Sequence, residues 1–259
     1  MTASDAAQDE PRVALITGGA KGIGLATAKL FDQRGYRVAV LDADEEALQV
    51  ANRNHNHNWM LLPTDVSSAA QVDGAVAAIA HAWGRIDVVV NNAGIAFAAS
   101  LAEHSNADWA RVFAVNVQSA FFVCRAALPW LQASRGAIVN VSSMTALVGQ
   151  PRGVAYTASK GALVAMTKAL ALELAPAGVR VNCVCPAGVD TPLMRSWAAS
   201  QSDPAAVLQA QAEMHLLGRM ATPDEIAAAI VFLATPDASF ITGVILPVEG
   251  GATLGYRRA

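Results

Sequence analysis

Residues 13–31 read VALITGGAKGIGLATAKLF, and their pattern predicts the fold class. Its first part, VALIT, is an aliphatic run without polar alternation, which is typical of a strand buried on both faces. Glycines at positions 18, 22 and 24 follow, and an Ala-rich segment of helical period comes after them. A strand, a glycine-rich turn and a helix in this order predict a parallel α/β sheet whose first turn can hold a phosphate group.

The rest of the chain repeats this alternation of apolar runs and longer helical segments. Near-continuous apolar strands joined by helices indicate a parallel sheet covered on both faces, and right-handed crossovers make it doubly wound. No repeat or low-complexity linker divides the chain, so we expect a flexible tail at residues 1–11 and a single α/β domain at residues 12–259. Seven strands are expected, beginning near Arg12, Tyr36, Trp59, Arg85, Gly136, Val179 and Val244.

The composition argues against several kinds of partner. The chain has 259 residues, of which 54% are hydrophobic and 15% charged, and its net charge is −3. This charge gives no reason to expect nucleic acid or an anionic membrane as partner. No run reaches the unbroken apolar length of a membrane span, and the N-terminus lacks the features of a signal peptide. Three cysteines make no disulfide framework, and Cys183 and Cys185 are expected to be buried, small apolar side chains in a cytoplasmic protein.

The glycine-rich turn predicts a dinucleotide site. Gly18, Gly22 and Gly24 let the backbone approach a pyrophosphate, and the helix that follows offers free N–H groups and a positive dipole. Asp42 ends the second strand, where a carboxylate hydrogen-bonds the adenosine ribose and repels a 2′-phosphate; a helix N-cap role is the compatible alternative. Lys21 argues for NADP, because its cation could bind that phosphate. We give Asp42 more weight and expect NAD.

The stretch YTASK, from Tyr156 to Lys160, predicts the chemistry. On a helix, positions i and i+4 lie on one face, so the phenol and the ammonium are neighbours. A tyrosine with its ordinary pKa of about 10 is a poor proton acceptor at neutral pH. A nearby cation favours the phenolate and lowers that pKa, which would make Tyr156 a general base for an alcohol or a general acid for a ketone.

Together, several motifs resemble the short-chain dehydrogenase/reductase family. They are TGGAKGIG from Thr17 to Gly24, NNAG from Asn91 to Gly94, Ser143 thirteen positions before Tyr156, and Tyr156-x-x-x-Lys160. The resemblance extends from about Val13 to Gly251. It implies a Rossmann fold, a nicotinamide cofactor and hydride transfer between an alcohol and a carbonyl compound.

The resemblance also implies roles for particular residues. Tyr156 transfers the proton, Ser143 hydrogen-bonds the substrate oxygen, and Lys160 lowers the tyrosine pKa and holds the nicotinamide ribose. Asn116 matches the position where a broken helix turn holds a water that links the lysine to solvent. The implied cofactor contacts are Gly18, Lys21, Gly22, Ile23, Gly24, Asp42, Asp65, Val66, Asn92, Ala93, Gly94, Tyr156, Lys160, Pro186, Gly188, Val189 and Thr191.

A long stretch from about residue 190 to 218 interrupts the alternation and is expected to form a substrate lid. Before it, Pro186-Ala187-Gly188 places alanine where the family usually has glycine, and we expect this to alter the shape of the pocket without loss of activity. Arg152 could bind a substrate carboxylate or be a surface charge. The candidate substrate contacts are Ser143, Thr145, Gln150, Arg152, Tyr156, Met194 and Trp197, with Ile95, Phe97 and Leu147 beside them.

We therefore expect an NAD-dependent oxidoreductase that interconverts a secondary alcohol and its ketone. The expected substrate is a small polyol, sugar or hydroxy-ketone, and a cyclic or terpenoid alcohol is an open alternative. The alternatives are an NADPH-dependent 3-oxoacyl thioester reductase and a catalytically silent dinucleotide-binding scaffold. No metal is expected, and His55 and His57 are interpreted as part of a solvated loop. The family resemblance implies a homotetramer.

Overall fold

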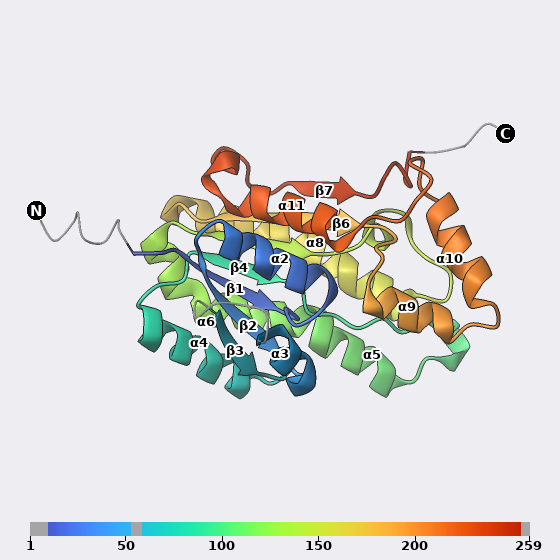
Figure 1. Cartoon of the computed structure of the whole chain (residues 1–259), viewed down its shortest axis with the longest axis horizontal. Helices are drawn as coiled ribbons and strands as arrows, with labels where there is room; N and C mark the ends of the chain where they lie inside the picture. Colours follow the sequence, from blue (N-terminus) through green and yellow to red (C-terminus); the bar gives the residue numbers. More distant parts are fainter. Residues whose placement is uncertain (1–9, 53–58, 255–259) are drawn as a thin grey trace, which may run out of the picture.

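The computed structural model describes residues 10–52 and 59–254, so His55 and His57 lie outside the described residues. Seven strands form one parallel sheet in the order β3-β2-β1-β4-β5-β6-β7 (Figure 1). This confirms the predicted doubly wound, seven-stranded parallel sheet. The strands are β1 (Val13–Thr17), β2 (Arg37–Asp42), β3 (Trp59–Pro63), β4 (Val88–Asn91), β5 (Ala137–Val141), β6 (Arg180–Pro186) and β7 (Ile245–Val248).

Alternate residues of the central strands contribute to two cores, one on each face of the sheet. In β1, Ala14 and Ile16 pack into one core, while Val13 and Leu15 pack into the other. All side chains of β1 are buried, which explains its lack of polar alternation. The first core is covered by α2 (Gly22–Gln33), α3 (Glu45–Asn52) and α11 (Pro223–Ala234), and the second by α4 (Ala69–Trp83), α6 (Ser119–Ser134) and α8 (Val154–Leu174).

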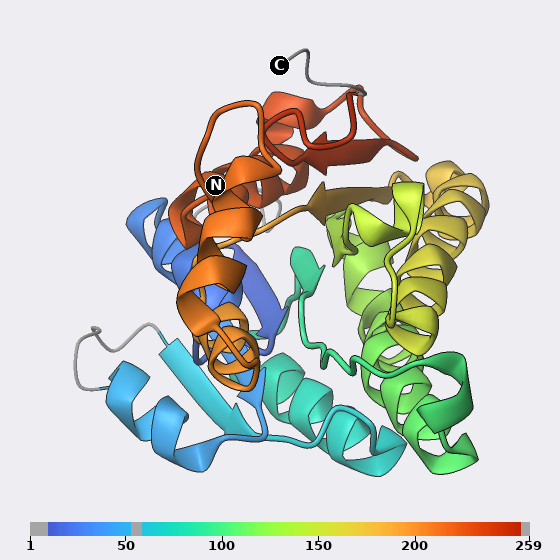
Figure 2. The ribbon, with the colours of Figure 1, turned by 90° about the vertical axis from the view of Figure 1, so that its right-hand side faces the viewer.

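The strand order reverses between β1 and β4, which are neighbours in the sheet. The chain leaves β1 for α2 on one face and eventually reaches α6 on the other face after β4. Ligands of such sheets bind in the crevice outside the carboxyl ends of the strands at this reversal. Figure 2 looks onto this edge.

The stretch from residue 190 to 218 forms two helices beside the carboxyl edge, α9 (Pro192–Ala199) and α10 (Pro204–Glu213), drawn in orange in Figure 2. Each begins with proline after a capping side chain: Thr191 accepts a hydrogen bond from the Met194 N–H, and Asp203 accepts one from the Ala206 N–H. Short helix α7 (Thr145–Val148) lies on the segment between β5 and α8.

Residues 106–134 form one continuous helical stretch, made of α5 (Asn106–Phe113), a π-turn (Ala114–Gln118) and α6. It is long and apolar enough to cross a membrane by length and composition, contrary to the sequence-based expectation, because α5 and α6 are continuous through the π-turn. Its inner face, including Val123, Ala127 and Leu131, packs into the second core. Core helices of globular proteins pass the same test, so this finding does not by itself indicate a membrane span.

Asp87 ties the amino ends of β1 and β4 together. It is only 7% exposed, and its Oδ2 accepts hydrogen bonds from the Val13 N–H at 2.8 Å and from Arg85 Nε at 2.9 Å. Arg85 Nη2 donates to its Oδ1 at 2.7 Å. Loss of this carboxylate removes two hydrogen bonds of the Arg85 guanidinium and the acceptor of the Val13 N–H.

We therefore expect Asp87→Ala to lower the free energy of unfolding by about 2–3 kcal/mol, measured by urea denaturation. Asp73→Ala is the matched control, because the exposed Asp73 carboxylate lies 4.0 Å from Arg125 and its removal should change stability by less than about 0.5 kcal/mol. Equal losses in the two variants would contradict the role assigned to Asp87.

Candidate active site

The predicted phosphate-binding turn has the geometry of an anion cradle. Gly18 and Gly22 adopt φ of +62° and +53°, which side chains rarely tolerate. A Cβ at Gly24 would lie 2.2 Å from the Gly18 carbonyl oxygen, so the first turn of α2 approaches the loop closely. Lys21 is the N-cap of α2, and within the described residues no side chain caps this terminus. The free N–H groups of α2 therefore remain available to a pyrophosphate.

The end of β4 is bound directly to this turn. The Asn92 side-chain amide donates to the Thr17 and Gly18 carbonyls, both at 2.9 Å. Thr17 Oγ1 accepts hydrogen bonds from the N–H groups of Asn92 and Ala93 at 3.0 Å. The predicted cofactor residues Asn92, Ala93 and Gly18 are thus brought together, and Thr17 is a link that the sequence did not reveal.

The acidic residues at the end of β2 hold the Lys21 side chain in place. Lys21 Nζ bonds Asp44 Oδ2 at 2.5 Å, and this contact, with Asp42 and Glu46 nearby, raises the Lys21 pKa. Asp42 accepts the Ala20 N–H on Oδ2 and the Asp44 N–H on Oδ1, both at 3.0 Å. Asp42 therefore stands directly beside the glycine-rich turn, whereas the Lys21 cation is held by a carboxylate.

Predicted adenine contacts lie just past β3. Asp65 Oδ1 accepts hydrogen bonds from the Ser67 N–H and hydroxyl, and Val66 is buried. The Thr64 N–H donates to the Asp42 carbonyl, which connects this segment to the end of β2.

Past β6, the segment from Pro186 to Thr191 closes the other side of the cradle. A Cβ at Gly22 would lie 3.3 Å from Thr191 Cγ2, so the loop after β6 touches the phosphate turn. Ala187 is described by the structure and does not have a positive φ, so its methyl group brings no backbone strain. Val189 pairs with Ala221.

His215 binds the backbone of this loop at Gly188. The sequence did not predict this role. It is only 1% exposed. Its Nε2 accepts the Gly188 N–H at 3.2 Å, and its Nδ1 lies 2.7 Å from the Gln211 carbonyl, to which it donates. A Cβ at Gly188 would lie 2.9 Å from the His215 ring. Nothing in the local sequence marked this histidine, because the contact joins segments 27 residues apart.

Tyr156, Ser143 and Lys160 are brought together at the carboxyl end of β5. Tyr156 and Lys160 lie one turn apart near the start of α8, and Lys160 Nζ is 5.7 Å from the centre of the tyrosine ring. Ser143 is 8% exposed, and its side chain lies close enough to the phenol to lower the Tyr156 pKa. The Thr145 N–H donates to Ser143 Oγ at 3.2 Å and fixes the serine.

The electrostatics of this group differ from the sequence-based expectation. Burial raises the Tyr156 pKa, and the Ser143 side chain lowers it only in part. Lys160 is not among the causes of the shift. Its own pKa is lowered to about 8, chiefly by burial, and its Nζ donates to the Val141 carbonyl at 2.8 Å. The expectation that the ammonium lowers the tyrosine pKa is thus not met here, because burial of the phenol is the largest cause of the shift and raises the pKa.

Asn116 lies in the predicted broken helix turn, which is the π-turn between α5 and α6. Its Oδ1 accepts the Ile95 N–H at 2.8 Å, and its Nδ2 donates to the Ile95 carbonyl and to Ser159 Oγ, both at 3.0 Å. A Cβ at Gly94 would lie 3.3 Å from Lys160 Nζ and 3.4 Å from Asn116 Oδ1. A side chain at position 94 would therefore crowd both of these groups.

The candidate substrate residues do not all share one environment. Thr145 is buried, and its hydroxyl has no hydrogen-bond partner in the described part of the chain. Met194 and Trp197 on α9 are half-buried. Arg152 is exposed and pairs with Glu103 at 3.1 Å, which favours the surface-charge interpretation, and Gln150 is exposed as well.

Two further hydroxyls support the catalytic group. Ser142 Oγ donates to the Lys160 carbonyl at 2.7 Å, and Ser159 Oγ donates to the Tyr156 carbonyl at 2.7 Å.

Cys183 and Cys185 are buried free thiols in β6. Over residues 10–52 and 59–254, no group of three or more His, Cys, Asp or Glu side chains could hold a metal ion.

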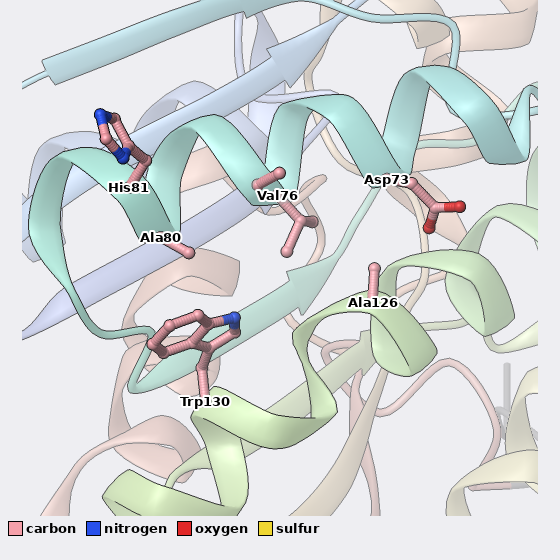
Figure 3. A pocket seen from close by; sticks show the side chains of 7 residues that line it. Asp73, Val76, Ala80, His81, Ala126 and Trp130 are labelled. Atoms are coloured by element: carbon pink, nitrogen blue, oxygen red, sulfur yellow. The ribbon is translucent and has the colours of Figure 1, made fainter.

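A cavity of about 410 Å³ lies between α4 and α6, and its lining includes His81 of α4 and Trp130 of α6 (Figure 3). Its lining includes none of the predicted catalytic or cofactor residues. It belongs to the helix layer and is separate from the carboxyl edge.

The chain resembles known oxidoreductases over nearly its whole length. Residues 18–253 match a family model described as "Enoyl-(Acyl carrier protein) reductase". The chain is 41% identical to mouse (Mus musculus) L-fucose dehydrogenase over 95% of this chain and 90% of that protein, and 40% identical to meso-2,3-butanediol dehydrogenase of Serratia marcescens over 93% and 94%. A 3-ketoacyl-(acyl-carrier-protein) reductase of Brucella melitensis, solved with NADH, superimposes with a TM-score of 0.86 at 34% identity, covering 94% of this chain and 99% of that one. With the glycine cradle and the Ser143–Tyr156–Lys160 group in place, the chain belongs to the short-chain dehydrogenase/reductase family of NAD(P)-dependent oxidoreductases.

Proposed function

We propose that this protein is an NAD-dependent dehydrogenase that oxidises a secondary alcohol of a sugar or small polyol to the ketone and also runs the reverse reaction. The observation that carries the proposal is the placement of Tyr156, Ser143 and Lys160 beside a glycine-lined dinucleotide cradle. The uncapped terminus of α2 and the turn made by Gly18 and Gly22, both with positive φ, fit the pyrophosphate of a nicotinamide dinucleotide.

The protein manages the proton, while the bound nicotinamide accepts or supplies the hydride. In oxidation, the Tyr156 oxygen takes the proton from the alcohol, and in reduction it returns that proton to the carbonyl oxygen. Ser143 donates a hydrogen bond to the same substrate oxygen and stabilises charge that develops there. The Lys160 ammonium lies 5.7 Å from the centre of the Tyr156 ring, where its positive charge stabilises a phenolate.

The preference for NAD is supported by the charges at the end of β2. A 2′-phosphate would meet the Asp42 carboxylate, while the Lys21 cation that could compensate is held by Asp44. Like charges brought together in this way cost free energy and favour the cofactor without the phosphate.

The names of relatives support a hydroxyl-rich substrate. Two of the relatives are named for a sugar and a diol, L-fucose and meso-2,3-butanediol. The 3-oxoacyl thioester reductase remains the second candidate, favoured by the Brucella structure.

We also propose a cytoplasmic homotetramer that uses the outer faces of α5, α6 and α8. Large apolar side chains are exposed there: Trp109 at 42%, Phe121 at 51% and Leu172 at 81%. Such a surface is typical of a protein interface.

Tyr156→Phe tests the proton transfer. We expect kcat for L-fucose and for 2,3-butanediol with NAD to fall about 10²–10⁴-fold, because general acid–base catalysis supplies a factor of this size. The affinity for NADH, measured by fluorescence titration, should stay within about twofold, since the phenol adds little to dinucleotide binding. Tyr36→Phe, at the opposite edge of the sheet, is the control and should keep kcat. Near-normal turnover by Tyr156→Phe would refute the assignment of Tyr156, whereas no turnover by the wild type would favour a silent scaffold.

Asp42→Ser tests the choice of cofactor. The variant should raise the ratio of kcat/KM with NADP to kcat/KM with NAD by about tenfold or more, because about 1.4 kcal/mol of removed repulsion corresponds to tenfold. Asp73→Ser removes the same charge from α4 and should leave the ratio unchanged. A wild-type preference for NADPH, or a ratio that Asp42→Ser does not move, would overturn the preference for NAD.

Lys160→Met tests the burial of the ammonium in the cofactor-free protein. The folded pKa of about 8 lies below the ordinary value of 10.5, so the unfolded chain binds more protons between these values and wild-type stability rises with pH across that window. We expect the variant to be more stable than wild type at pH 7, by about 1–3 kcal/mol in urea denaturation, and this advantage to shrink as pH rises from 8 towards 10. Lys168→Met on the exposed face of α8 should show no such trend; a pH-independent difference for Lys160→Met would contradict the prediction.

A further inference from the structure

A second cavity, of about 490 Å³, opens at the amino edge of the sheet. Figure 1 shows this edge of the sheet on the left. It is lined by the segments that precede or begin β1, β2, β4, β5 and β6. The catalytic group lies at the other ends of these strands, so the cavity is separate from the dinucleotide cradle. Its charged and phenolic lining residues are Arg12, Tyr36, Arg85, Asp87, Arg135 and Arg180.

The lining carries an excess of positive charge in a protein whose net charge is −3. Four arginines face one carboxylate, and Asp87 is already bound to Arg85. Arg12 makes one long contact, 3.5 Å to the Tyr36 hydroxyl, and Arg135 has no side-chain hydrogen bond among the described residues. Among the lining residues that the structure describes, the one carboxylate is therefore already bound to one of the four arginines.

Arg180 is half-buried, and burial lowers its pKa. Its Nη1 donates to the carbonyls of Leu233 and Ile241, and its Nη2 donates to the Thr235 carbonyl. A guanidinium has five N–H donors. Two of them therefore lack a partner within the described ranges, and no carboxylate there neutralises the charge.

Helix ends compensate this charge only in part. Arg135 caps α6 in a left-handed conformation, and Leu233 and Thr235 lie at the end of α11. A helix C-terminus carries about half a negative charge. Two such ends offset about one of the three arginine charges left after Asp87 has paired with Arg85.

We propose that this cavity binds a small polyvalent anion of the phosphate or polycarboxylate class. Arginine forks match the planar geometry of carboxylate and the oxygens of phosphate, and guanidinium donors held close together by the fold bind such groups strongly. Because the site and the cradle lie at opposite edges of the sheet, anion and dinucleotide bind at the same time.

The test uses the full chain saturated with NADH, so that pyrophosphate cannot occupy the dinucleotide cradle. Sodium pyrophosphate and citrate are titrated separately by calorimetry against chloride at equal ionic strength, and the rise in Tm is recorded in parallel. Arg12→Gln and Arg135→Gln are the variants, since neither side chain carries the fold as Arg180 does. We expect one anion per chain, with affinity about tenfold lower in each variant. Arg111→Gln on α5 removes the same charge outside the cavity and should bind as wild type does.

The pyrophosphate and citrate titrations distinguish the two chemistries, and binding of either one with the expected loss in both variants supports the site. Three results would overturn the proposal. They are no binding of either anion to NADH-saturated protein, equal weakening by Arg111→Gln, and binding that Arg12→Gln and Arg135→Gln leave unchanged.

Discussion

The burial of the Lys160 ammonium is the constraint on which the catalytic edge depends. A buried cation loses its hydration, so the surrounding backbone has to supply acceptors and space. The Val141 carbonyl at the end of β5 supplies the acceptor, and the missing side chain of Gly94 supplies the space. Ser142 fixes the Lys160 backbone through its carbonyl. The ends of β4 and β5 and the start of α8 are thus held in one arrangement, and that arrangement also places Tyr156 beside Ser143.

Features that depend on local geometry could be predicted from the sequence. The glycines at 18, 22 and 24 permit only a few backbone paths, and a strand before them with a helix after them selects the cradle observed. The spacing of Tyr156 and Lys160 is one helical turn, so their proximity follows once α8 is a helix. The seven-stranded parallel sheet follows for a similar reason, because apolar runs buried on both faces have few other ways to pack.

Features that depend on distant partners could not be predicted. The Tyr156 pKa is set by how much of the chain covers the phenol, and the sequence indicates only the neighbouring charge. Lys21 could have bound a phosphate until the fold placed Asp44 beside it. Arg152 finds Glu103 on the surface, 49 positions away. His215 acts on Gly188 across two helices of the 190–218 stretch, and a buried histidine with two satisfied nitrogens leaves no pattern in the sequence.

The polarity of the fold explains why the two edges of the sheet attract opposite charges. The helix after each parallel strand begins at the carboxyl edge and ends at the amino edge, so positive helix termini gather at one edge and negative termini at the other. At the carboxyl edge, α2 leaves its N–H groups free for an anion. At the amino edge, Arg180 takes carbonyls at the end of α11, and Arg135 ends α6. Each of these arginines carries a full positive charge, whereas the helix C-terminus that it contacts offers only about half a negative charge. The excess of positive charge makes the amino edge a second place for an anion to bind.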